Sequence, residues 1–126
     1  ATRIQIHAAS LCSLKNIALH FQCDEVIYHL KLSMEQRQNI FLLFKEGINN
    51  ALKYADCTEI TIHLNKQNNL FVLLLKDNGK GFNVLETEDG NGLLNMQKRA
   101  KDIGGSFSIS STCNVGTTIE FSCNIT

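Results

Sequence analysis

The spacing of apolar residues predicts a helix over residues 33–54. Within this segment, apolar side chains recur every three or four positions, as they do where one face of a helix packs on a sheet. Ser33 and Gln36 have the spacing of a capping box, which predicts that the helix begins there.

The opposite face of this helix carries Glu46, Asn50 and Lys53. Their positions i, i+4 and i+7 stack on one side of a helix, so the three side chains point into the same volume. A carboxylate, an amide and an ammonium together can handle a metal-bound phosphate chain. A solvated face with a Glu46 to Asn50 contact explains the same pattern, so this helix alone does not decide.

The remaining pattern predicts strands at residues 17–23, 58–64, 70–76, 106–112 and 117–125, and helices at residues 2–13 and 93–103. Residues 70–76 are continuously apolar, which predicts a strand buried on both faces, and residues 66–69 form its hairpin turn. Strands paired as hairpins with helices between them predict an α+β fold. We expect a two-layer sandwich whose mixed, mostly antiparallel sheet is covered on one face by about three helices.

Composition narrows the class of protein. A chain of 126 residues fits one domain, and residues 1–15 could be the end of a longer upstream helix. Lys plus Arg and Asp plus Glu both number 12, so the chain lacks the basic surface that nucleic acid requires. The five cysteines include no CxxC pair, and we expect free thiols in a reducing cytoplasm. No apolar run reaches the ~20 residues that span a bilayer.

Two glycine-containing turns are candidates for ligand contacts. Asp77 stands where the apolar strand ends, and Gly79 and Gly81 allow the backbone to turn and approach a ligand closely. The segment 90–93, Gly-Asn-Gly-Leu, precedes a predicted helix, whose N-terminal N–H groups attract anions. Each turn is common in proteins, so an ordinary acidic turn and an ordinary helix cap are equally open.

Four motifs in fixed order make the pattern specific. They are ExxxNAxKY at residues 46–54, DNGKGF at 77–82, GNGLxNMxxRA at 90–100 and GTTIEF at 116–121. With them the chain resembles the ATP-binding catalytic domain of two-component sensor histidine kinases, within the GHKL ATPases that include gyrase, a heat-shock chaperone and mismatch-repair proteins. The GLxNMxxRA helix is most similar to the branch with a nitrate-sensor type of dimerisation domain.

The resemblance implies roles for individual residues around ATP and Mg²⁺. Asn50 matches the magnesium ligand, and an amide oxygen suits that hard ion. Glu46 matches the carboxylate that acts as a base or orients the nucleophile, and Lys53 matches a cation beside the phosphates. Asp77 matches the acceptor for the adenine amino group, which would favour ATP over GTP. The other implied contacts are Gly79 and Gly81 around the base, Gly90, Asn91, Gly92 and Leu93 against the phosphates, and Thr117 in the adenine pocket.

Three positions depart from the family pattern or stay open. Tyr54 stands where many relatives have His, and Gly47 stands where Ala is common, at a cost of up to ~1 kcal/mol. Arg99 could serve the nucleotide, but an ion pair with Asp102 at i, i+3 explains it as well.

The phosphate acceptor is missing from the matched motifs. None of the four histidines (His7, His20, His29 and His63) combines a helix with the acidic neighbour that the family's acceptor has. The resemblance therefore implies an upstream histidine-bearing dimerisation domain and a response regulator as partners, in a homodimeric, membrane-anchored parent with this domain in the cytoplasm. By itself the chain should bind Mg-ATP without autophosphorylation.

Two other functions remain open from the sequence. An anti-sigma-factor type of serine kinase shares these motifs, and the residues upstream would distinguish it. A non-catalytic ATP-binding interaction module is a third reading, although Glu46 and Asn50, which such modules commonly lose, are both present.

Overall fold

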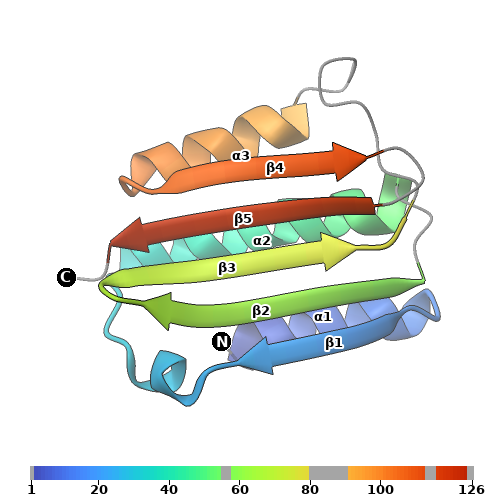
Figure 1. The fold of residues 1–126 in the computed structure, drawn as a ribbon, viewed down its shortest axis with the longest axis horizontal. Coiled ribbons are helices and arrows are strands. Elements are labelled where there is room, and N and C mark those ends of the chain that lie inside the picture. Colours follow the sequence, from blue (N-terminus) through green and yellow to red (C-terminus); the bar gives the residue numbers. More distant parts are fainter. Residues whose placement is uncertain (1, 55–57, 80–90, 113–115, 125–126) are drawn as a thin grey trace.

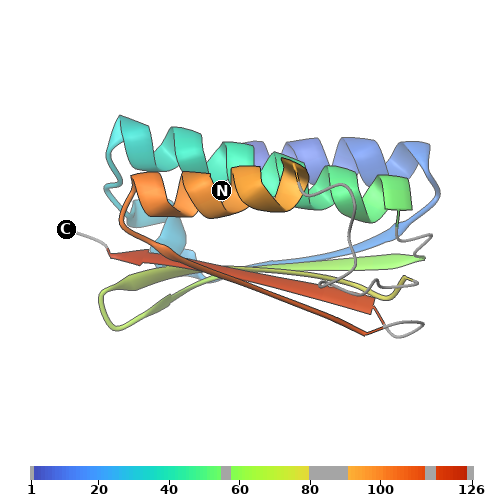
Figure 2. The same ribbon diagram turned by 90° about the horizontal axis from the view of Figure 1, so that it is seen from above.

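Three helices lie on one face of a five-stranded sheet, which confirms the predicted two-layer α+β sandwich (Figure 1, Figure 2). The structure is a computed structural model that describes residues 2–54, 58–79, 91–112 and 116–124. The helices are α1 (Thr2–Leu14), α2 (Met34–Tyr54) and α3 (Asn91–Asp102), and a short 3-10 helix, η1 (Glu25–His29), precedes α2.

The sheet is mixed and mostly antiparallel, as predicted. Its strands are β1 (Ala18–Cys23), β2 (Glu59–Gln67), β3 (Leu70–Asp77), β4 (Ser106–Thr112) and β5 (Gly116–Asn124). In space they follow the order β1-β2-β3-β5-β4, so β3 is central and β1 and β4 are the edges. Only β1 and β2 are parallel within this sheet. The connection between them contains α2, because parallel neighbours need a crossover segment.

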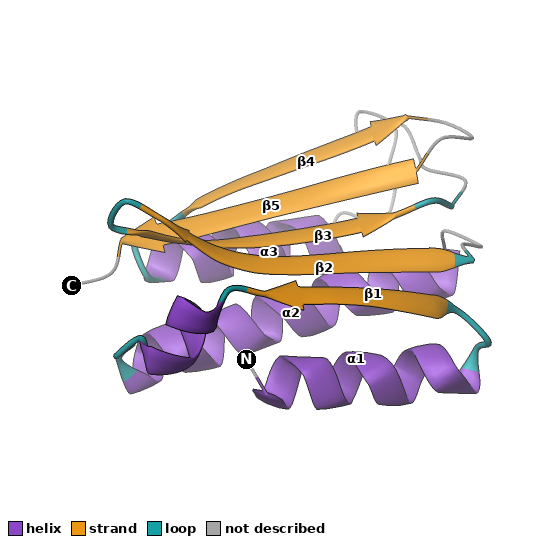
Figure 3. Cartoon of the chain, turned by 60° about the horizontal axis from the view of Figure 1, so that its bottom comes forward, coloured by secondary structure: helices purple, strands orange, loops and turns teal. Residues whose placement is uncertain are grey.

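The core lies between the sheet and the helix layer (Figure 3). Alternate residues of the strands point toward the helices. On α2, Phe44 and Ile48 are fully buried in the same core. At about 25 cal/mol per Å², burial of such side chains is the main force that holds the two layers together. The predicted apolar stripe of α2 is therefore its sheet-facing side.

The start of α2 is fixed by the predicted capping box. The Ser33 N–H donates to Gln36 Oε1 and the Gln36 N–H donates to Ser33 Oγ, both at 3.0 Å. Gln36 Nε2 also donates to the carbonyl oxygen of Asn124 at 2.9 Å, which fastens this end of the helix to the end of β5. The cap thus sets both where α2 begins and where it sits on the sheet.

The β2–β3 hairpin is tighter than predicted. β2 continues to Gln67, and the turn consists of Asn68 and Asn69, with a φ of 56° at Asn68. An asparagine tolerates this left-handed conformation better than most residues. The predicted burial of β3 on both faces is confirmed for Val72, which is 6% exposed although it alternates with core residues and points to the face without helices.

Helix α1 is packed onto α2 by aromatic and cationic contacts. The Arg3 guanidinium lies 4.0 Å from the ring centroid of Phe41. The His7 ring meets Phe41 and Phe44 edge-on, at centroid distances of 5.7 Å and 5.8 Å. Burial, together with the Lys45 and Arg3 charges, lowers the pKa of His7. The environment between the two helices therefore favours the neutral form of the imidazole.

Replacing Gly47 by Ala is expected to stabilise the domain by about 0.5–1 kcal/mol, because Ala loses less backbone entropy than Gly in a helix. An added Cβ would lie 3.4 Å from Ile119 Cδ1 and 3.6 Å from Leu75 Cδ1, which are ordinary contact distances. Urea unfolding of wild type and Gly47→Ala measures the change. A loss of stability would mean that the core around Leu75 and Ile119 cannot accept one more methyl group.

Candidate functional site

Two buried polar residues meet at one end of the central strands. Asp77 ends β3 and Thr117 stands near the start of β5, and the two are direct partners across the sheet. The two residues are 4% and 7% exposed, and Asn39 on α2 is the one other buried polar residue among those that the structure describes. The C-terminal end of α2 and the first turn of α3 lie at the same end of the sheet (Figure 1). The fold thus brings together polar groups from elements that are far apart in the sequence.

The Asp77 carboxylate stands in an environment that opposes its charge. Burial raises the pKa of Asp77, and backbone hydrogen bonds from Gly79 and Thr117 counteract only part of that effect. The Gly79 N–H donates to Asp77 Oδ1 at 2.9 Å, which closes a tight turn over residues 77–79. A desolvated carboxylate with one oxygen already engaged is a strong acceptor for an N–H donor on a ligand.

Ser111 extends this polar group, and the sequence reading missed it. Ser111 on β4 pairs with Thr117 on β5, and the two hydroxyl oxygens are 2.9 Å apart. Ser111 Oγ also lies 3.5 Å from the carbonyl oxygen of Gly116. The partner hydroxyl restricts how Thr117 can turn its own hydroxyl toward a ligand. A serine in a Ser-rich strand gives no signal of this role until the register of the two strands is known.

Gly116 also shapes this site, although the sequence alone indicated no role for it. Its φ is 138°, a conformation that essentially only glycine adopts. A Cβ at this position would overlap the carbonyl oxygen of Asp77 and would lie 3.2 Å from Asn78 Cα. The absence of a side chain on β5 therefore allows the backbone at Asp77 to approach closely.

The helical site residues lie on the C-terminal half of α2. Glu46 and Asn50 are four residues apart on that helix, and both side chains are half-buried. Lys53 belongs to the last turn of α2, where the structure describes its backbone but not its side chain. Asn91, Gly92 and Leu93 form the first turn of α3, again with side chains outside the description. Gly81 and Gly90 lie outside the described residues.

Helix α3 begins at Asn91, two residues before the predicted start, and its N-terminus faces the end of the sheet that holds Asp77 (Figure 1). Unpaired N–H groups at such an end favour anions. Among the side chains that the structure describes, Arg99 is half-buried and forms no ion pair with Asp102. The i, i+3 pair with Asp102 is therefore not formed in this structure, and the role of Arg99 stays open.

The donor set fits an adenine nucleotide with a magnesium ion. Asp77 supplies a buried acceptor for an amino group, Thr117 supplies a hydroxyl beside it, and Asn50 supplies an amide oxygen of the hard type that Mg²⁺ accepts. In the described part of the chain, no three His, Cys, Asp or Glu side chains gather into a metal-binding group. Magnesium bound with nucleotides commonly takes its other ligands from phosphate oxygens and water.

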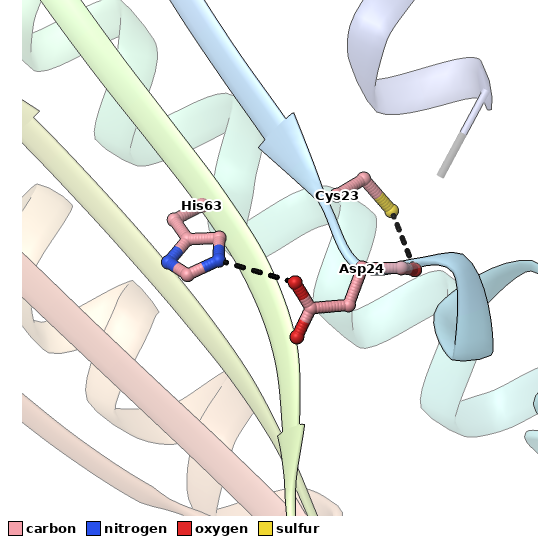
Figure 4. A network of polar contacts seen from close by, with 3 residues as sticks. All are labelled: Cys23, Asp24 and His63. Atoms are coloured by element: carbon pink, nitrogen blue, oxygen red, sulfur yellow. Dashed lines mark hydrogen bonds and ion pairs between the residues drawn. The ribbon is translucent and has the colours of Figure 1, made fainter.

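A second polar cluster lies where β1 ends beside the middle of β2, and it has a different character (Figure 4). Asp24 Oδ1 lies 3.6 Å from His63 Nε2, and Cys23 Sγ donates to the Asp24 carbonyl oxygen at 3.6 Å. The composition is that of a thiol nucleophile with a base, but Cys23 packs toward the core and His63 alternates with core residues on β2. Burial raises the pKa of the Cys23 thiol, which opposes the reactive thiolate. The cluster ties β1 to β2 and does not form a catalytic pair.

Comparison with known proteins gives one family for most of the chain. A family model described as "Histidine kinase-, DNA gyrase B-, and HSP90-like ATPase" matches residues 35–126. The chain is 39% identical over 95 residues to the sensor protein VraS of Staphylococcus haemolyticus, covering 75% of this chain and 27% of that protein. It is 33% identical over 107 residues to the signal transduction histidine-protein kinase/phosphatase DegS of Bacillus subtilis, covering 82% of this chain and 28% of that protein. The chain therefore spans about a quarter of the length of these relatives.

A solved structure shares the same arrangement of helices and strands. The histidine kinase domain of the blue-light activated histidine kinase of Erythrobacter litoralis superposes with a TM-score of 0.81 at 16% identity, over 97% of this chain and 59% of that one. At that identity the likeness concerns the fold. Within the described ranges of this chain, no helix is both long and apolar enough to cross a bilayer.

Proposed function

This chain belongs to the histidine kinase-, DNA gyrase B- and HSP90-like ATPase family, and from that membership we propose that it is the ATP-binding catalytic domain of a sensor histidine kinase. The observation that carries the proposal is the buried Asp77 carboxylate beside Thr117, at the end of the sheet where α2, the helix that carries Glu46 and Asn50, ends (Figure 1). Adenine offers its amino group to such an acceptor, whereas guanine has a carbonyl oxygen at that position. The site should therefore prefer ATP to GTP.

We assign roles to the chain's own residues as follows. Asn50 would hold Mg²⁺ together with phosphate oxygens and water, and Glu46 would act as a base or orient the nucleophile. Lys53 would neutralise phosphate charge. The glycines at 79 and 81 would border the base, and residues 90–93 would lie against the phosphates. When bound, ATP supplies the γ-phosphoryl group, and the domain contributes position and charge compensation.

The acceptor of the phosphoryl group is proposed to be a histidine on an upstream dimerisation domain. Of the described histidines, His7 is helical, but its neighbour Ala8 is not acidic and its ring is enclosed by Phe41 and Phe44. The names of the relatives, a sensor protein and a signal transduction histidine-protein kinase/phosphatase, support the kinase role. We further propose a homodimeric, membrane-anchored parent that passes the phosphoryl group to a response regulator. This domain would then lie on the cytoplasmic side.

Calorimetric titration of the chain with ATP and with GTP, each with and without Mg²⁺, tests the proposal. We expect binding of Mg-ATP and at least tenfold weaker binding of GTP. We also expect no autophosphorylation, since the proposed histidine acceptor lies on the upstream domain, and only very slow turnover of ATP by the isolated domain. A folded chain that binds neither nucleotide would contradict the proposal. Equal affinity for ATP and GTP would contradict the role given to Asp77 while leaving phosphate binding intact.

A further inference from the structure

Asn78 lies next to a proposed ligand contact but has no role among those contacts. It follows directly after Asp77, at the point where β3 ends and the turn over residues 77–79 begins. Its side chain is exposed and points to β2, where it bonds to the first described residues after residue 57. The side chain therefore acts on the protein itself.

The Asn78 carboxamide makes three hydrogen bonds to the start of β2. Its Oδ1 accepts from the N–H of Thr58 at 3.0 Å and from the N–H of Glu59 at 2.9 Å. Its Nδ2 donates to Thr58 Oγ1 at 2.9 Å. The backbone N–H of Asn78 adds a bond to the Glu59 carbonyl oxygen at 3.3 Å. One residue thus continues the β2–β3 pairing beyond its last backbone pair, Ile60 with Asp77.

On the other side, β5 presses against the same peptide. Gly116 leaves room only because it has no side chain, and an added Cβ would overlap the Asp77 carbonyl oxygen. The peptide between Asp77 and Asn78 is therefore held between β2, through the Asn78 carboxamide, and β5, through the close approach of Gly116. Neither contact involves the carboxylate, so both leave it available.

We propose that Asn78 is a positioning residue that anchors the turn of Asp77 to β2 and so sets how well the domain distinguishes a base with an amino group from one without. This inference rests on the proposed function, because it assumes that Asp77 accepts the amino group of adenine. The free energy of a hydrogen bond depends steeply on the distance and angle between donor and acceptor. If the turn loosens, the hydrogen bond between the Asp77 carboxylate and the amino group weakens first. The preference for a base with an amino group therefore falls before binding of the nucleotide is lost.

The test compares binding of ATP with that of purine riboside triphosphate, which lacks the amino group, by calorimetry. In Asn78→Ala we expect ATP to bind about tenfold more weakly and purine riboside triphosphate to bind within about twofold of wild type. Asn78→Asp keeps acceptors for the Thr58 and Glu59 N–H groups, so it should restore most of the preference for ATP. Asn69→Ala, which removes an exposed asparagine just before β3, is the matched control and should change neither affinity.

Loss of affinity for both nucleotides by the same factor in Asn78→Ala would overturn the positioning role, since general destabilisation acts in that way. An unchanged preference for ATP would overturn it as well. If wild type binds neither nucleotide, the proposed function fails, and amide hydrogen exchange then decides on Asn78. Exchange of the Gly79 N–H about tenfold faster in Asn78→Ala than in Asn69→Ala supports the anchor, and equal rates overturn it.

Discussion

Asp77→Asn is expected to weaken ATP binding about 10- to 100-fold while leaving the nucleotide-free domain at least as stable as wild type. The first effect follows because the variant removes a charged acceptor from a buried site, and hydrogen bonds to charged groups contribute about 1.5–3 kcal/mol. Calorimetric titration measures the affinity, and urea unfolding measures the stability. Asp24→Asn, which changes an exposed carboxylate on β1's side of the sheet, is the control and should bind ATP like wild type.

The stability half of this prediction follows from the direction of the pKa shift. Burial raises the pKa of Asp77 above its ordinary value of 3.8, so the folded state holds the proton more tightly than the unfolded state does. The resulting stabilisation is complete below the unfolded pKa and is lost as pH rises through the folded pKa. At neutral pH the ionised carboxylate therefore destabilises the free domain, and a neutral amide relieves that cost.

The same shift predicts a pH dependence of binding. As pH falls through the raised pKa of Asp77, the carboxyl gains its proton and becomes a weaker acceptor, so the preference of wild type for ATP over GTP should decline. In Asp77→Asn the preference should be small at every pH. A wild-type preference that stays constant while the pH is lowered until the Asp77 carboxyl is protonated, or an Asp77→Asn variant that keeps the preference, would contradict the role of this residue.

Gly116→Ala is expected to destabilise the domain by about 3 kcal/mol and to abolish selective ATP binding. The new methyl group would overlap the Asp77 carbonyl oxygen, and the φ of 138° at this position is strained for any residue with a side chain. Relief of the overlap requires β3 or β5 to move, and either movement displaces Asp77 relative to Thr117. Urea unfolding and nucleotide titration measure the two effects.

Gly104→Ala separates backbone strain from steric overlap, the two causes of the stability loss expected in Gly116→Ala. Gly104, after α3, also has a positive φ, of 65°, but no heavy atom lies within 4 Å of an added Cβ. We expect this variant to lose only about 1 kcal/mol, from backbone strain alone, and to keep its ATP affinity. Equal losses in Gly104→Ala and Gly116→Ala would show that the overlap with Asp77 contributes nothing.

The sequence predicted α2 well because two independent signals agree there. The capping box at Ser33 and Gln36 fixes the start of the helix, and the apolar period fixes which side meets the sheet. The strands were also predicted, within a few residues, because their alternation follows the burial of one face. The end of β2 was predicted too early, since Lys66 and Gln67 are polar and their pairing with β3 depends on the hairpin register.

What the sequence could not provide was the register within the hairpins. Ser111 reaches Thr117 because the β4–β5 register places them opposite each other, and Asn78 reaches Thr58 because the β2–β3 pairing ends at Ile60 and Asp77. Local propensity carries no information about such contacts between segments. Asp77 was found because motif and burial coincide at one residue, whereas Gly116 needed the three-dimensional approach of two backbones.

The parallel pairing of β1 and β2 has a consequence for how the domain folds. The loop between these strands runs from residue 24 to residue 58 and contains α2. Closing it carries an entropic cost that no local hairpin contact offsets, so we expect β1 to join the sheet after α2 has docked. The helix that bears Glu46 and Asn50 would then belong to the folding unit of that sheet edge. We therefore expect opening of the site and of that edge to occur together.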